Sequence, residues 1–438
     1  MAGNKGSSIK RRISFRGLSN IRPTIQVPLA MLFRLGAALS IGWMIHAHHL
    51  RVTAEGDRPI LASEVREFLP ETHTLMVDVK SPRGGFHAYN KKKKKIGYVV
   101  RTMPHSRDIN GYSGPSDVLM VFDTNDALLG LSIRHSYDTP SHVEDVTKDY
   151  LFMERWNGQT WSELANQEKV FGVSGATRTS EAVANSVFLR AAKAEGLNRT
   201  GPSFNFRWQD ATLILTALAG LLLAFWRNPR IQRRKTWIHV AIVIYLGLVS
   251  GDLLAQSLIS SWMEHGIPWR TLPGLVFLAA IAFIIPWATG HPVYCTHICP
   301  HGHLQRWLMK LVPANRRPRL NPDVKWGILA LPGLLLVLVL TVVFLKLPID
   351  LAGIEPFDAW ALRGAGLATI IVAVVSLAFS AAVPMGYCRF GCPTGLLLDL
   401  TKKNPHGFHR RDAWLLGLLL LSCFYYFGYE IWNPWLKS

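Results

Sequence analysis

The chain has 438 residues, of which 49% are hydrophobic and 18% are charged, and it contains five cysteines. This composition excludes a disordered chain, a collagen and a small disulfide-stapled protein, and it disfavours a purely water-soluble globule. A formal net charge of +19 would suit a nucleic-acid-binding protein, so the positions of the basic residues have to decide between that class and a membrane protein.

Seven apolar segments approach the length of about 20 residues that a helix needs to cross roughly 30 Å of hydrocarbon. They are centred on 27–48, 209–226, 237–259, 271–290, 326–347, 367–386 and 413–431. The first segment carries Arg34 and follows a basic stretch, so it is either a signal anchor or a cleaved signal peptide. The sequence therefore predicts a membrane α-helical bundle of about six or seven spans.

The basic residues are distributed unevenly between the predicted loops. Four segments would face the cytoplasm if the N-terminus does: 1–26, 227–236, 291–325 and 387–412. Together they hold 22 Lys and Arg, against three in the short outer segments 260–270, 348–366 and 432–438. This asymmetry follows the positive-inside rule, and contact with anionic lipid headgroups explains the same residues. The charge therefore indicates a multi-pass protein of the bacterial inner membrane, and nucleic acid is not an expected partner.

Residues 50–207 differ from the rest of the chain because they are polar and contain no predicted span. Short β-type runs alternate with turns there, and two helical patterns follow them. The sequence predicts one exported α+β domain at 50–207. It lies between a basic N-terminus with its anchor or signal peptide (1–49) and a transmembrane domain (208–438).

One segment of this domain places small residues and a hydroxyl just before a predicted helix. It reads Ser174-Gly175-Ala176-Thr177. Thr177 would lie beside the unpaired backbone N–H groups and the positive dipole end of that helix, which is a favourable place for a phosphate. An ordinary helix cap without a ligand would show the same pattern. The residues alone leave both interpretations open.

The segment 174–177, with Thr179-Ser180 after it, resembles the flavinylation motif of FMN-binding domains in the sodium-pumping quinone reductase, the Rnf complex and NosR/NirI-type proteins. In that family the last Thr of the motif carries FMN through a phosphoester, which a separate flavin transferase forms. The resemblance therefore makes Thr177 the site of covalent FMN attachment, with Ser174, Gly175 and Ala176 as the rest of the motif.

Two further segments are similar to loops of the same family. Gly111–Pro115 resembles its glycine-rich segment before a strand, and His135–Pro140 resembles its acidic-Thr-Pro flavin loop. The resemblance covers roughly residues 75–200, and it implies that Tyr112, Asp138 and Thr139 help to bind the cofactor.

The predicted bundle carries one motif twice. Y-C-x-x-x-C-P-x-G occurs at 294–302 and at 387–395, each time at the cytoplasmic end of the second of two spans. This pattern indicates an internal duplication, and two halves related by a pseudo-twofold axis would bring four thiols together. The predicted metal ligands are Cys295, Cys299, Cys388 and Cys392.

Four thiolates suit either an iron–sulfur cluster or structural zinc. A disulfide is disfavoured because these cysteines face the reducing side of the membrane. At a membrane rim, in a chain that also resembles a flavoprotein, a redox centre is the better interpretation, and a [4Fe–4S] cluster is favoured over [2Fe–2S]. Cys423 has no partner and is interpreted as a buried small hydrophobic residue.

An FMN domain followed by spans with two C-x-x-x-C-P motifs resembles the NosR/NirI family and its smaller relatives in organohalide respiration, over most of residues 70–405. Members of that group are thought to pass electrons to a periplasmic reductase or to support its maturation. The resemblance implies an electron-transfer component rather than a stand-alone enzyme. Its FMN domain would lie in the periplasm, with quinol or a partner subunit as donor and an exported reductase as acceptor.

Two alternatives stay open from the sequence: a redox sensor, regulator or maturation factor for a periplasmic reductase, and a zinc-stapled membrane scaffold. The predicted topology also raises a difficulty. With the cysteines near the inner rim and the flavin outside, about 30 Å of hydrocarbon would separate the two centres. Either the motif loops re-enter the bundle, or another cofactor or a quinone bridges the distance.

Overall fold

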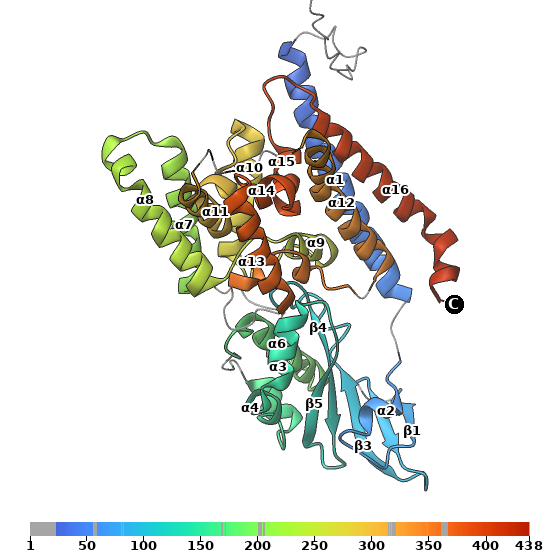
Figure 1. Ribbon diagram of the computed structural model, residues 1–438. Helices are drawn as coiled ribbons and strands as arrows, with labels where there is room; N and C mark the ends of the chain where they lie inside the picture. Colours follow the sequence, from blue (N-terminus) through green and yellow to red (C-terminus); the bar gives the residue numbers. More distant parts are fainter. Residues whose placement is uncertain are drawn as a thin grey trace, which may run out of the picture.

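The protein is described by a computed structural model. The described residues are 23–55, 59–79, 81, 83–167, 170, 172–199, 204, 206–313, 315, 317, 321–347, 349–360 and 367–437. The basic segment 1–22, which the sequence assigns to the cytoplasm, lies outside them. Figure 1 shows two bodies, a helical bundle and a smaller domain built around a sheet, which meet at one end of the bundle.

The smaller domain contains a five-stranded antiparallel sheet in the order β1-β2-β3-β4-β5. The strands are β1 (Thr74–Val77), β2 (Phe86–Tyr89), β3 (Lys95–Arg101), β4 (Ser116–Phe122) and β5 (Leu128–Ser136). The helices are α2 (Ala62–Val65), α3 (Pro140–Lys148), α4 (Tyr150–Glu154), α5 (Trp161–Asn166) and α6 (Thr177–Ala194). This confirms the α+β character that the sequence predicts for the region.

Strand β4 is buried along its whole length because both faces of the sheet are covered. Its side chains alternate between the two faces, as the pleat of a strand requires. Met120 and Phe122 pack with Val187 of α6 in one core, whereas Leu119 packs with Val65 of α2 in another. The sheet therefore holds α6 rigidly, and the start of that helix is the predicted flavin segment.

The bundle contains helices and short helical segments from both ends of the chain. They are α1 (Pro23–Glu55), α7 (Trp208–Phe225), α8 (Pro229–Ile244), the π-helix η1 (Tyr245–Ser250), α9 (Gln256–His265), α10 (Pro273–Thr289), the π-helix η2 (Tyr294–Ile298), α11 (Pro300–Leu311), α12 (Pro322–Leu345), the 3₁₀-helices η4 (Ala352–Ile354) and η5 (Asp358–Trp360), α13 (Leu367–Ala382), α14 (Gly386–Phe390), α15 (Pro393–Thr401) and α16 (Arg410–Lys437).

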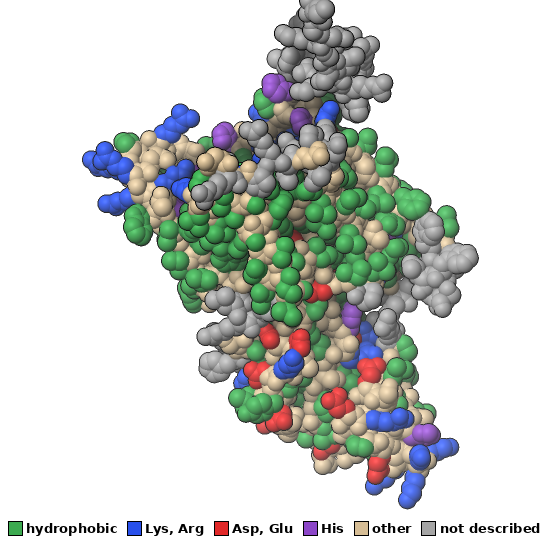
Figure 2. All heavy atoms as spheres, viewed as in Figure 1, with side chains coloured by type: hydrophobic (Ala, Val, Ile, Leu, Met, Phe, Trp, Pro, Cys, Tyr) green, Lys and Arg blue, Asp and Glu red, His purple; other side chains and the backbone are tan. Residues whose placement is uncertain are grey.

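Among the described residues, four helices are long and apolar enough to cross a membrane: Gln26–Val52, Trp208–Phe225, Gly327–Leu345 and Arg410–Tyr429. Two predicted spans correspond to the shorter apolar helices α10 and α13. In Figure 2, hydrophobic side chains cover the middle of the bundle on the face shown, and Lys and Arg gather at the end of the bundle remote from the sheet domain. These features are compatible with a multi-pass membrane protein.

The predicted span at 237–259 is not a continuous helix, which corrects the sequence prediction. Helix α8 passes into η1, the chain turns at Gly251, whose φ is +69°, and α9 begins only at Gln256. A left-handed φ suits glycine because it has no Cβ. The break is possible inside the bundle because tyrosine hydroxyls bond the peptide groups of Leu253 and Leu254.

Arg34, the charge within the first predicted span, has partners inside the bundle. Its Nε lies 2.7 Å from Asp412 Oδ1 in α16, and its other nitrogens donate to the carbonyls of Lys402 and Gly407 at 2.8 and 2.9 Å. Only 2% of the Arg34 surface is exposed. A charge in a membrane helix is tolerated when it is paired in this way. Helix α1 is thus packed into the bundle through a buried ion pair.

Candidate functional site

Thr177 is the first residue of α6, a helix of 18 residues. The loop before Thr177 is held by hydrogen bonds to Ser180 of the same helix. Ser180 Oγ accepts from the Val173 amide at 2.9 Å and donates to the Ala176 carbonyl at 2.9 Å. Ala176 is buried, whereas Ser174, Gly175 and Thr177 are exposed. Thr177 is therefore held on the surface at the positive end of a helix dipole, which suits a phosphoester there.

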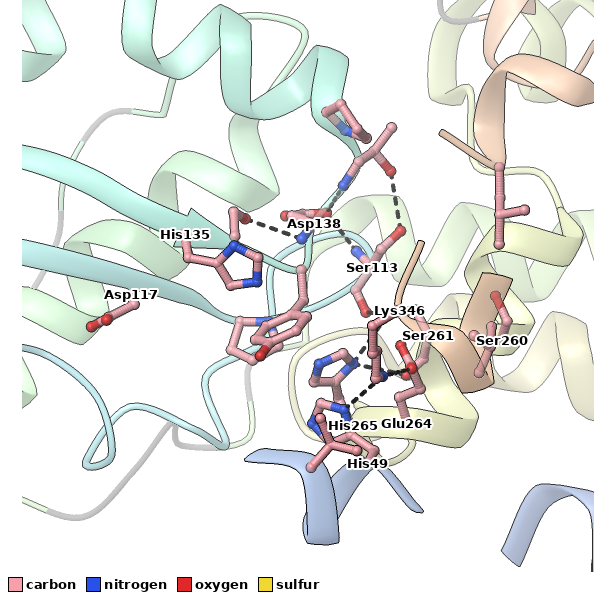
Figure 3. Close-up of a pocket in the computed structure, with 18 of the residues that line it drawn as sticks. His49, Ser113, Asp117, His135, Asp138, Ser260, Ser261, Glu264, His265 and Lys346 are labelled. Atoms are coloured by element: carbon pink, nitrogen blue, oxygen red, sulfur yellow. Dashed lines mark hydrogen bonds and ion pairs between the residues drawn. The ribbon is translucent and has the colours of Figure 1, made fainter. Parts of the chain in front are cut away.

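Asp138 ties together the three segments that the sequence assigns to flavin binding. Its buried carboxylate accepts hydrogen bonds from the backbone amides of Tyr112, Ser113 and Thr139, at 3.0, 2.7 and 2.9 Å, and from the Thr179 hydroxyl at 2.7 Å. All four donors converge on one side chain, so the loops at 111–115 and 135–140 are locked against the start of α6. Figure 3 shows Asp138 beside Ser113.

The glycine at the start of this arrangement is required by close packing. A Cβ on Gly111 would lie 2.0 Å from Asp138 Oδ2, which no side chain can tolerate without moving the carboxylate. The Thr139 and Ser113 hydroxyls lie 3.1 Å apart. Asp138 and Thr139 are each 5% exposed. Their role is therefore to hold the loops near Thr177 in place by buried hydrogen bonds.

Tyr112 extends from these loops to the helical bundle. Its hydroxyl donates to the Leu253 carbonyl at 3.4 Å, in the broken segment before α9. Burial, reinforced by the carboxylates of Asp358 and Asp252, raises the pKa of Tyr112, so the hydroxyl stays protonated and can donate. An ion pair also joins the sheet domain to the bundle, since Arg178 Nη2 lies 3.0 Å from Asp252 Oδ2.

The two cysteine motifs fold alike. Cys299 and Cys392 are the cap residues before α11 and α15, and in both helices a proline follows at the first position. Proline suits that position because its missing N–H would have no helical partner there. Both second cysteines thus lie at the positive ends of helices, where thiolates are stabilised.

The motif glycine permits close approach to the sulfur. The amide of Gly395 donates to Cys392 Sγ at 3.1 Å, and a Cβ at this position would lie 3.2 Å from the same atom. In the first motif, a Cβ on Gly302 would lie 3.0 Å from the Cys295 carbonyl oxygen. The first turn of each helix therefore passes so close to its cysteine motif that a side chain at the last position of C-P-x-G would be crowded, which explains the glycine there.

The structure brings the two halves of the duplication together. Helix α11 of the first half packs on α13 of the second, and α10 packs on α15. Cys299 and Cys392 belong to one buried core, and the partly buried Cys295 packs against it. Gln305 of the first half bonds the partly buried Cys388 of the second, so all four predicted ligands lie around the contact between the two halves.

Gln305 of α11 joins the halves directly, and sequence reasoning missed it. Its Nε2 donates to Cys388 Sγ at 3.1 Å, and its Oε1 accepts from the Ser380 hydroxyl at 2.9 Å. At the matching offset in the second half stands Leu398. Because the residue lies outside the repeated motif, no sequence signal identifies it.

A second group of possible metal ligands lies outside the cysteine motifs. Among the described residues, one ligand atom each of His49, Glu264 and His265 lies within 4.8 Å of the others.

The flavin loops and the cysteine motifs are joined through the broken segment before α9. Tyr112 bonds the carbonyl of Leu253, and the next amide, that of Leu254, donates to the Tyr294 hydroxyl at 3.0 Å. Tyr294 immediately precedes Cys295. One short segment of the bundle thus contacts both a flavin loop and the first cysteine motif.

A cavity of about 960 Å³ lies where the sheet domain meets the bundle. Ser113, Asp138 and Thr139 line it from the flavin loops, and the ends of α1, α9 and α12 line it from the other side. In Figure 3 a group of polar side chains gathers on the bundle side of this cavity: His49, Glu264, His265 and Lys346.

Comparisons with known proteins agree with both sites. Residues 111–188 match the FMN-binding domain family, and residues 271–319 and 365–416 both match the 4Fe-4S binding domain family. The second family matches twice, once over each cysteine motif, as the internal duplication requires. The chain therefore carries an FMN-binding domain and a 4Fe-4S binding domain, with FMN and a [4Fe–4S] cluster as cofactors.

One curated relative is an uncharacterized protein of Methanocaldococcus jannaschii. It is 23% identical over 176 residues, which cover 39% of this chain and 72% of the relative. No solved structure matches the chain.

Proposed function

We propose that this chain is a membrane electron-transfer protein that passes electrons between covalent FMN on Thr177 and a cluster held by Cys295, Cys299, Cys388 and Cys392. The observation that carries the proposal is one continuous buried core. Tyr112, Leu253, Leu254, Tyr294, Cys299 and Cys392 all belong to it. Tyr112 of the flavin loops and the second cysteines of both motifs thus share one buried interior.

The two cofactors would supply the redox chemistry, the flavin exchanging one or two electrons and the cluster one. The chain supplies position and shielding. Asp138 fixes the loops beside Thr177, and the start of α6 offers its amides to a phosphate. Gln305 and Gly395 donate hydrogen bonds to cysteine sulfurs, which favours the thiolate form and tunes a cluster potential.

The proposed topology follows from the charges and the helices. Helix α8 with η1, α10 and α13 complete a bundle of seven crossings with the four long helices. Helix α1 is retained as a span because Arg34 is paired with Asp412. The basic loops face the cytoplasm and the FMN domain faces the periplasm.

In this arrangement electrons come from quinol or a partner subunit and pass to an exported reductase. The order of FMN domain, spans and paired motifs supports a place among the NosR/NirI-type proteins. Attachment of the cofactor requires a flavin transferase, and the exposure of Thr177 would give such an enzyme access.

In-gel flavin fluorescence after denaturing electrophoresis tests the attachment. The Thr177→Ala variant should lose the fluorescent band. Thr147→Ala is the matched control, because Thr147 is also an exposed helical threonine whose hydroxyl donates to the carbonyl four residues earlier, as Thr177 does. A band of normal intensity from Thr177→Ala would refute attachment at this residue.

A further inference from the structure

The cavity between the sheet domain and the bundle has one polar and one apolar side. Val342, Val343, Leu347, Ile349 and Leu351, from the end of α12 and the loop after it, form an apolar wall. The flavin loops lie opposite. The volume of about 960 Å³ falls within the range of sites for cofactor-sized ligands. A ligand here would lie at the edge of the apolar bundle and beside the flavin loops at once.

The polar side is built from three helix ends that are far apart in the sequence. Lys346 forms an ion pair with Glu264, and its Nζ lies 3.2 Å from His49 Nδ1. The ring of His265 lies 4.4 Å from that of His49 and 4.6 Å from that of Tyr137, between ring centres. The cluster therefore joins α1, α9, the end of α12 and the flavin domain at one point (Figure 3).

His265 presents an unused hydrogen-bond acceptor. Its Nδ1 lies 3.1 Å from the Ser261 carbonyl, and since a carbonyl only accepts, Nδ1 carries the proton. Its Nε2 then has a lone pair, and this atom is buried without a partner. Burial lowers the pKa of His265 to about 3, so the ring is neutral. Burial also raises the pKa of Glu264, against the effect of Lys346, which brings its carboxylate closer to accepting a proton.

We propose that this cavity is a binding site for a quinol headgroup, with the ring against the apolar wall of α12 and the hydroxyls toward His265 Nε2 and Glu264. A quinol fits because it combines an apolar ring with two hydroxyl donors and reaches the site from the lipid. The proposal rests on the proposed function, since a flavin attached at Thr177 would be the electron acceptor.

Oxidation at this site balances. A bound quinol loses two O–H bonds and becomes a quinone; one proton goes to Nε2 of His265, the other goes to the Glu264 carboxylate, and the two electrons go to the flavin. Lys346, already paired with Glu264, compensates the carboxylate charge before the transfer. The protons are thus released on the same side of the membrane as the FMN domain.

Photolabelling of the purified holoprotein with an azido-quinone tests the site without relying on turnover. Label should appear in peptides that contain 257–265 or 342–351, and excess unmodified quinone should suppress it. The double variant Glu264→Gln, His265→Gln should lose at least tenfold of the labelling. Leu347→Trp, which fills the cavity and leaves the polar cluster intact, should do the same. His406→Gln, an exposed histidine on a distant loop, is the control and should label normally.

Flavin and iron contents of each variant separate this proposal from the proposed function. The quinol site would be overturned if the variants keep both cofactors but label normally. It would also be overturned if the wild-type label is confined to other peptides. Neither result would contradict electron transfer between the cofactors. Wild-type protein without flavin or iron would overturn the proposed function instead. A stoichiometric divalent metal that disappears with His265→Gln would also overturn the quinol site, because His49, Glu264 and His265 would then be metal ligands.

Discussion

The flavin site and the cysteine site are built in opposite ways. The flavin segment is a surface loop: Thr177 is exposed, and backbone amides held by the buried Asp138 give it its shape. The cysteine site has two buried and two partly buried thiols, and side chains from two duplicated halves form it. A group attached from outside needs an accessible acceptor, whereas a cluster needs a water-excluded set of thiols. The two sites should therefore respond independently to mutation, except at the loop that joins them.

The largest expected effect is the loss of the cluster from a single cysteine substitution. Cys299→Ser should lower the iron content from about four atoms per chain to near zero, because three thiolates hold a cubane cluster poorly. Covalent flavin should stay at the wild-type level. Iron analysis and in-gel fluorescence check both points, with Cys423→Ser as the control that keeps both cofactors. Joint loss of flavin and iron would show that the two sites are not independent.

Removal of the buried ion pair should weaken the bundle alone. Arg34→Gln leaves Asp412 as an uncompensated buried charge, which costs about 3–5 kcal/mol. Thermal unfolding in detergent should shift strongly downward, while Arg230→Gln, an exposed arginine at the start of α8, should change little. Equal stabilities of the two variants would argue that α1 is not part of the folded bundle.

The joining loop is where the two regions should be coupled. Tyr294→Phe leaves the buried amide of Leu254 without its acceptor, at a cost of about 1–3 kcal/mol, and should slow electron exchange between flavin and cluster. Tyr112→Phe weakens the other side of the same loop. In a double-mutant cycle, the effects of Tyr294→Phe and Tyr112→Phe on stability and on the exchange rate should be non-additive, because both hydroxyls bond the same peptide segment. Strict additivity would mean that the loop is not a shared link.

The smallest effect concerns the sheet domain alone. A hydrogen bond from Arg134 lowers the pKa of Glu64 below its ordinary value. The stabilisation is therefore present above the unfolded-state pKa of Glu64 and is lost as the pH falls through its folded-state pKa. Glu64→Gln should cost no more than about 1 kcal/mol at neutral pH. The stability difference from wild type, followed by denaturant unfolding, should shrink on acidification; a difference that grows would contradict this pairing.

The sequence predicted the local features well and the long-range ones poorly. The four cysteines, the α+β domain and the hydroxyl at a helix start are visible because each depends on spacing along the chain. The break at Gly251 escaped prediction because hydropathy alone reads 237–259 as one span. The contact between Gln305 and Cys388, and the meeting of His49, His265 and Lys346, depend on packing between distant helices, which no local pattern encodes.

The central claim is that the flavin and the cluster exchange electrons within one chain. Stopped-flow mixing of the oxidised detergent-purified protein with a substoichiometric reductant, followed at flavin and cluster wavelengths, tests it most directly. The account predicts redistribution between the two centres at a rate independent of protein concentration. A rate that rises in proportion to concentration would contradict it, because the electrons would then move between molecules rather than through the loop that joins Tyr112 to Tyr294.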